Sequence, residues 1–141
     1  SIPIGQSLFH FVMGGGGPVG VLSVNVRGAR ALVTKSFSGK CRAYCTVCFE
    51  NQTCKTKVAD NSIHPNWDET FAFDIFAGPA QQLTFSVWEK GPFPNQDECL
   101  GTLAIKLDFS QEFSEEREHP LVLSGKGESQ ISLFLQFSRT E

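Results

Sequence analysis

The stretch "CKTKVADNSIHPNWDETFAFDI" (54–75) contains two strand-like runs separated by a turn. Near its end Phe71, Phe73 and Ile75 alternate with other residues, so these three apolar side chains lie on one face of a strand. The preceding "IHPN" (63–66) combines residues typical of a turn. We therefore predict a short polar strand over 54–59, then a turn, then a strand with one face in a hydrophobic core.

The same period of two recurs on both sides of this stretch. Besides 54–59 and 70–76, it predicts strands over 21–27, 43–49, 83–89, 100–107, 119–124 and 130–137. The acidic segment 110–118 has no apolar period, and we predict a helical turn with a solvated face for it, inside a loop. Many short strands without a long helix indicate an all-β fold, an eight-stranded antiparallel β-sandwich.

The chain of 141 residues has the length of one domain. We expect an N-terminal extension with a Gly-rich hinge over 1–19, the sandwich over 20–138 and a tail over 139–141. The extension either adds an edge strand or packs on the sandwich, and both alternatives stay open. The chain does not begin with Met and shows no signal-peptide pattern, which indicates a domain of a longer protein.

Composition narrows the function classes. A net charge of −3 gives no overall attraction to nucleic acid or anionic lipid, so any such attraction must be local. No apolar run reaches the roughly 20 residues of a transmembrane helix. There is no nucleophile elbow, phosphate loop or paired-histidine motif, and His64 and His119 each precede a proline in a predicted turn. We therefore expect a binding module without catalytic residues or cofactor.

Five cysteines are present, at 41, 45, 48, 54 and 99. An odd number does not indicate a disulfide framework. Cys45 and Cys48 have the spacing of a zinc-ligand pair, but they lie on a predicted strand, where residues three apart point to opposite faces. We expect free thiols, no metal, and a reducing, cytoplasmic location.

The order of motifs resembles the C2 domain family. The segments that carry the resemblance are "GVLSVNVRGARAL" (20–32), "AYCTVCF" (43–49), the opening stretch 54–75, "LTFSVWE" (83–89) and "CLGTLAIKL" (99–107). The resemblance implies a C2-like sandwich over about 20–137, with Pro65, Trp67 and Phe71 as scaffold residues. The final strand-like segment "GESQISLFLQF" (127–137) is similar to the permutation that carries its extra strand at the C-terminus, called type II.

The resemblance also implies two loops that in this family supply about five acidic calcium ligands. The matching positions here hold Ser36, Arg42, Glu89, Gly91 and Asp97. Calcium requires six to eight oxygen ligands, mostly from carboxylates, and an arginine at one ligand position repels it. We therefore expect no calcium binding. Arg42 either forms an internal ion pair with Glu89 and Asp97 or points outward to a ligand.

Basic and apolar residues make these loops a candidate lipid site. Lys35, Lys40 and Arg42 could meet lipid phosphates, with Phe37 and Phe93 as apolar tips. Lys55 and Lys57 match half of a second, lysine-rich family site.

These features favour a calcium-independent targeting or scaffolding module that binds anionic phospholipid membranes, in signalling or membrane trafficking. We expect it to be monomeric in isolation, cytoplasmic and peripheral on membranes, with no nucleic acid as partner. The alternative is a protein-interaction module, without lipid binding of its own, whose sheet faces or edge strands dock a partner.

Overall fold

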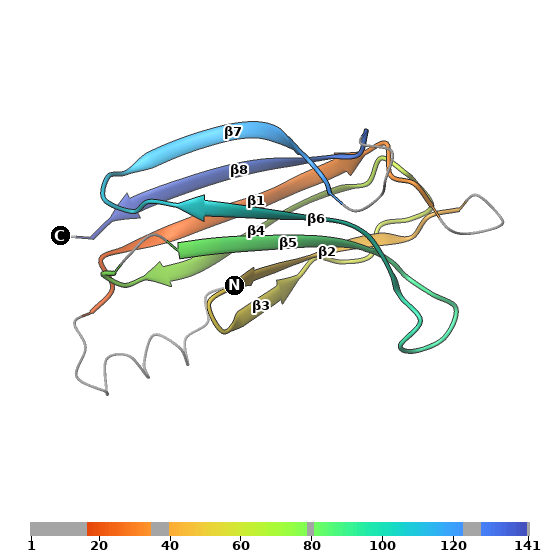
Figure 1. The fold of residues 1–141 in the computed structure, drawn as a ribbon, viewed down its shortest axis with the longest axis horizontal. Helices are drawn as coiled ribbons and strands as arrows, with labels where there is room; N and C mark the ends of the chain where they lie inside the picture. The colour runs from red at the N-terminus through yellow and green to blue at the C-terminus, as the bar shows by residue number, and fades with distance from the viewer. Residues whose placement is uncertain (1–16, 35–39, 79–80, 123–127, 141) are drawn as a thin grey trace.

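The chain folds into two four-stranded antiparallel sheets packed face to face (Figure 1). The computed structural model describes residues 17–34, 40–78, 81–122 and 128–140. The strands are β1 Gly20–Arg30, β2 Ala43–Phe49, β3 Gln52–Lys55, β4 Asn66–Ile75, β5 Gln81–Glu89, β6 Glu98–Leu107, β7 Phe113–Pro120 and β8 Gln130–Arg139. None of these elements is a helix, and nothing in the described ranges is both helical and long enough to cross a membrane.

The strand order confirms the predicted topology. One sheet has the order β4-β1-β8-β7 and the other β3-β2-β5-β6. The C-terminal strand β8 lies between β1 and β7, and Leu22 of β1 is directly opposite Phe137 of β8. An extra strand at the C-terminus that pairs with the first strand is the arrangement that the segment 127–137 predicted.

The core lies between the two sheets and follows the predicted alternation. The largest fully buried side chains include Trp67, Phe49, Phe73, Phe85 and Phe137. Burial of one large apolar side chain stabilises the fold by roughly 1.5–3 kcal/mol. The indole of Trp67 also donates a hydrogen bond to the Ala43 carbonyl, 3.0 Å away, which ties β4 to β2 across the core. The predicted scaffold residues Pro65, Trp67 and Phe71 are all buried.

Three predicted elements were wrong in position or type. The predicted strand 54–59 is instead β3, which ends at Lys55. The segment 110–118, predicted as a helical turn, and the predicted strand 119–124 are replaced by one strand, β7 Phe113–Pro120, that pairs with β8 along its whole length. This pairing overrides the weak local preference of an acidic segment. Glu116 and Glu118 of β7 then form ion pairs with Arg27 and Arg30 of β1.

Four connections meet at one end of the sandwich, because the strands are antiparallel and alternate in direction. They are 31–42 between β1 and β2, 56–65 between β3 and β4, 90–97 between β5 and β6, and 121–129 between β7 and β8. We call this the loop end; it lies on the right in Figure 1. Both predicted family loops are therefore at the loop end.

Candidate functional site

Exposed apolar side chains gather at the loop end. Among the described residues the exposed large hydrophobic side chains are Val33, Phe93 and Val122, with exposed fractions of 38%, 64% and 67%. Each lies in a different loop-end connection. Phe93 was predicted as an apolar tip, whereas Val33 and Val122 were not, because a single apolar residue in a loop has no periodicity to mark it. The predicted tip Phe37 lies outside the described residues.

Basic side chains are also exposed in the loop-end connections. Lys40 and Arg42 in the first connection, Lys57 in the second and Lys90 in the third are all exposed. Lys90 lies between the family positions Glu89 and Gly91, and it was not singled out from the sequence because it matches no ligand position itself. Lys35 and Ser36 lie outside the described residues.

Arg42 does not form the ion pair expected for it. The ion pairs between described residues join Arg27 to Glu116, Arg30 to Glu118 and Arg117 to Glu115, so the alternative in which Arg42 pairs with Glu89 and Asp97 was wrong.

The first loop supplies a hydrogen-bond donor to Glu89. Glu89 is buried at the end of β5, and its Oε2 accepts a hydrogen bond from the Thr34 hydroxyl at 2.7 Å. The Glu89 carboxylate therefore accepts a bond from the neutral Thr34 hydroxyl, where a bond from the Arg42 guanidinium was expected. The exposed Arg42 side chain faces solvent.

The second acidic position, Asp97, is also satisfied by the protein. Its Oδ1 accepts a hydrogen bond from the Gly91 backbone N–H at 2.9 Å, and its Oδ2 accepts one from the Tyr44 hydroxyl. The Gly91 bond, followed by the Tyr44 bond, lowers the pKa of Asp97. Burial and the neighbouring Asp97 raise the pKa of Tyr44 to about 12. Asp97 therefore fixes the loop 90–97 onto β2.

Four of the five positions that match the family's calcium ligands lie in the described residues, and two of these four are carboxylates. Glu89 and Asp97 are the acidic residues among them, and both accept hydrogen bonds from protein donors. Within the described ranges no three His, Cys, Asp or Glu side chains are grouped so that they could hold a metal ion. Calcium takes six to eight oxygen ligands, mostly from carboxylates, so two carboxylates alone would not complete its shell.

Lys55 belongs to a small cluster with aromatic residues. Its ammonium lies 5.1 Å from the centre of the Tyr44 ring, a distance suited to a cation–π interaction. Tyr44 is directly opposite Trp88 in the next strand, and the Trp88 indole donates a hydrogen bond to the Thr46 hydroxyl at 3.2 Å. Lys57 lies beyond the end of β3, with its backbone N–H bonded to Glu69. Sequence reasoning found both lysines but not the aromatic pair beside Lys55.

All five cysteines are free thiols. The prediction that Cys45 and Cys48 diverge is confirmed, because Cys45 is fully buried while Cys48 is partly exposed on the other face of β2. Burial, followed by the charge of Glu89, raises the pKa of Cys41 to about 11, and burial also raises the pKa of Cys45. At neutral pH these two thiols stay protonated and behave as small apolar groups.

Comparison with known proteins agrees with this architecture. The chain is 30% identical over 100 residues to extended synaptotagmin-1 of Homo sapiens, a match that covers 67% of this chain and 9% of that protein. It is 34% identical over 92 residues to Protein C2-DOMAIN ABA-RELATED 11 of Arabidopsis thaliana, covering 65% of this chain and 54% of that one. The chain therefore spans only about a tenth of the length of the extended synaptotagmins that it matches.

Solved structures show the same fold. A C2 domain of plant extended synaptotagmin 1 superposes with a TM-score of 0.77 at 21% identity, covering 88% of this chain and 98% of that one. A structure with two C2 domains of extended synaptotagmin 2 gives a TM-score of 0.73 at 25% identity, covering 86% of this chain and 42% of that one. The family model of the C2 domain matches residues 20–122, which include seven of the eight strands. This chain therefore belongs to the C2 domain family.

Proposed function

We propose that this C2 domain is a calcium-independent, non-catalytic module that binds anionic phospholipid membranes through its loop end. The observation that carries the proposal is the gathering of Val33, Phe93 and Val122 at one end of the sandwich, among exposed basic side chains. Scattered exposed apolar residues are common, but a concentration of the largest ones at one end marks an interaction surface.

Apolar and basic residues support this function in different ways. An exposed phenylalanine that enters the bilayer interface gains from burial of its ring. Each exposed Lys or Arg near an anionic surface contributes about 1 kcal/mol. Lys40 and Arg42 lie in the same connection as Val33, and Lys90 is close in sequence to Phe93, so both contributions act at the same end of the domain.

Calcium independence is supported by the state of the acidic residues. Glu89 already accepts a hydrogen bond from Thr34, and Asp97 accepts bonds from Tyr44 and Gly91, so a calcium ion would compete with these donors for the two carboxylates. Arg42 adds a positive charge at the position of a third ligand. Basic side chains here replace the charge that a bound calcium would bring to an anionic membrane.

A headgroup contact at Lys55 and Lys57 would add to the loop-end contact. Lys55 lies near the loop end of β3, and its ammonium is held over the Tyr44 ring. Lys55 beside the Tyr44–Trp88 pair, with Lys57 two residues along the chain, fits one phosphorylated headgroup better than a broad anionic surface. This contact would make the domain selective for phosphorylated lipids, consistent with a cytoplasmic, peripheral role in signalling or membrane trafficking.

Co-sedimentation with vesicles tests the proposal. Vesicles of phosphatidylcholine alone, with added phosphatidylserine, and with added phosphoinositide separate apolar insertion from charge and headgroup contributions. We expect binding to the two anionic preparations, weakened by raised salt because exposed charges are screened over about 8 Å at physiological ionic strength. A domain that ignores all three preparations would overturn the proposal.

A further inference from the structure

The four edge strands of the sandwich differ in how they are protected. An exposed edge carries unpaired backbone groups, and proteins usually shield it with charges, proline or a short length. The edge strand β3 has only 4 residues, and β4 carries three acidic residues. In β7, which has 8 residues, four residues are charged and one is proline, without counting His119. In β6, by contrast, Lys106 is the only charged residue after Glu98.

The free edge of β6 already accepts one residue of this chain. The Thr102 N–H donates to the Val122 carbonyl and the Val122 N–H donates to the Thr102 carbonyl, both at 2.8 Å. In an antiparallel ladder alternate residues direct their N–H and C=O groups to the same side. The N–H and C=O groups of Ala104 and Lys106 therefore point to the same edge as those of Thr102, which pair with Val122.

No other described segment continues this pairing. The chain before Val122 turns away to the other sheet, where Pro120 is opposite Gln130 of β8. In the described ranges the pairing of β6 over Leu103–Leu107 involves β5 alone. Among the described residues, the backbone groups of Ala104 and Lys106 at this edge therefore have no partner, although those of the nearby Thr102 are paired.

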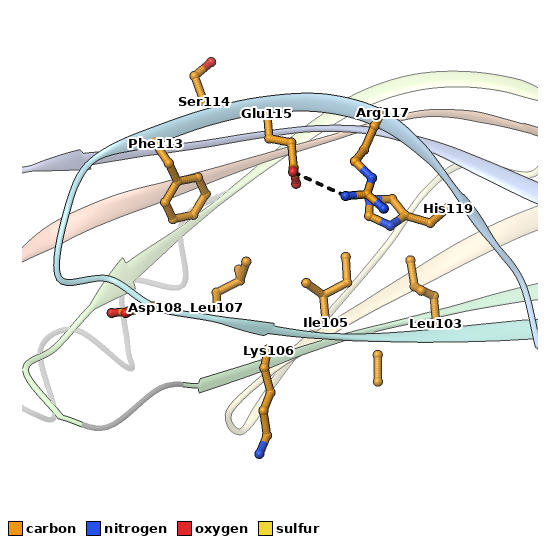
Figure 2. A pocket seen from close by; sticks show the side chains of 11 residues that line it. Leu103, Ile105, Lys106, Leu107, Asp108, Phe113, Ser114, Glu115, Arg117 and His119 are labelled. Atoms are coloured by element: carbon orange, nitrogen blue, oxygen red, sulfur yellow. Dashed lines mark ion pairs between the residues drawn. The ribbon is translucent and has the colours of Figure 1, made fainter.

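A slot lies next to this edge, between β6 and β7. Its volume is about 680 Å³. Figure 2 shows Leu103, Ile105 and Leu107 pointing into it from β6, with Glu115 and Arg117 facing them from β7. The turn 108–112 bounds one end of the slot and the Thr102–Val122 bridge lies at the other. The slot offers room and an apolar floor for side chains that enter from the edge.

We propose that the β6 edge binds an extended peptide segment of a partner protein, which adds to the sheet as a fifth strand. Residues of the peptide opposite Ala104 and Lys106 exchange backbone hydrogen bonds with them, as Val122 does with Thr102. Their side chains lie on the outer face beside Lys106, which favours acidic residues. The intervening side chains point into the slot over Leu103, Ile105 and Leu107, which favours apolar residues.

The residues that would bind the peptide differ from those of the proposed lipid site, although the two surfaces adjoin at Val122, whose backbone pairs with Thr102. Ala104 and Lys106 lie on the side of the sandwich, whereas Phe93 and the basic side chains around it belong to the loop end. Vesicle binding and peptide binding can therefore fail independently, and a variant of one surface should leave the other unaffected.

The probe is an acetylated and amidated heptapeptide of alternating glutamate and valine. We expect it to bind, and we expect slowed hydrogen exchange at the Ala104 and Lys106 amides in its presence. N-methylation of the glutamates removes the N–H groups that pair with β6 and should abolish binding. N-methylation of the valines, whose N–H groups point away from β6, should preserve it. Equal effects of the two methylated peptides would overturn the proposal.

Protein variants give a second test. Ala104→Pro removes one N–H on the free edge without breaking the pairing with β5, and should weaken the peptide at least about tenfold. Ala104→Val keeps that N–H and should bind within about twofold of the native chain. If Ala104→Pro does not fold, judged by circular dichroism, the methylated peptides on the native chain decide the question. Concentration-dependent dimers without peptide binding would overturn the proposal and assign the edge to a second copy of this chain.

Discussion

Replacement of Phe93 by alanine isolates the apolar part of membrane binding. The side chain is 64% exposed, so about two thirds of its surface is available for burial in a lipid interface. Full burial of a phenylalanine is worth roughly 1.5–3 kcal/mol, and the available share is therefore about 1–2 kcal/mol. That difference corresponds to a loss of about five- to thirtyfold in the affinity for anionic vesicles.

The measurement is vesicle co-sedimentation over a range of lipid concentrations, with a parallel thermal unfolding curve. Because Phe93 is largely exposed, we expect the free energy of unfolding to change by less than about 0.5 kcal/mol. Gln96→Ala, in the same loop and also exposed, is the matched control and should bind like the native chain. If Phe93→Ala binds as tightly as Gln96→Ala, the loop does not enter the membrane.

Three further predictions concern charge, hydrogen bonding and thiols. Arg42→Glu should reduce affinity for anionic vesicles at least about fivefold. It should not lower the melting temperature, since Arg42 has no ion pair with Glu89. A clear loss of stability would show that Arg42 and Glu89 do form an ion pair. Tyr44→Phe should lower the melting temperature at neutral pH, because it removes a hydrogen bond to Asp97. The folded-state pKa of Asp97 is lowered, so this stabilisation is present at neutral pH and is lost as the pH falls through the lowered pKa. The native and variant unfolding curves should therefore converge in acid; curves that stay apart would contradict this. Alkylation followed by mass spectrometry should leave the buried Cys41 and Cys45 unmodified in the native state while partly exposed thiols react; early modification of Cys45 would show that β2 opens readily.

Strands with different environments on their two faces were predictable from sequence. In β4, Phe71, Phe73 and Ile75 face the core and the residues between them face outward, so the period of two is strong. In β7 the residues on the inner face include Glu115 and Arg117, which face the open slot rather than the core. The usual apolar period is therefore missing, and only pairing with β8 makes this segment a strand.

The candidate site was only partly predictable, for two physical reasons. Arg42, Glu89 and Asp97, which match family positions, lie at the loop end. Sequence does not fix which donor reaches a carboxylate, and Thr34 bonds to Glu89 where Arg42 was expected. Single exposed residues such as Val122 become significant only when the fold brings separate loops together.

Vesicle binding by the native chain, with calcium and with a chelator, tests calcium-independent membrane binding. Vesicles containing phosphatidylserine or phosphoinositide are mixed with the protein in millimolar calcium or in excess EGTA, and the bound fraction is measured after sedimentation. Because Glu89 and Asp97 are already bonded to protein donors, we predict the same substantial bound fraction in both conditions. Binding that appears only with calcium, or no binding in either condition, would rule out calcium-independent membrane binding.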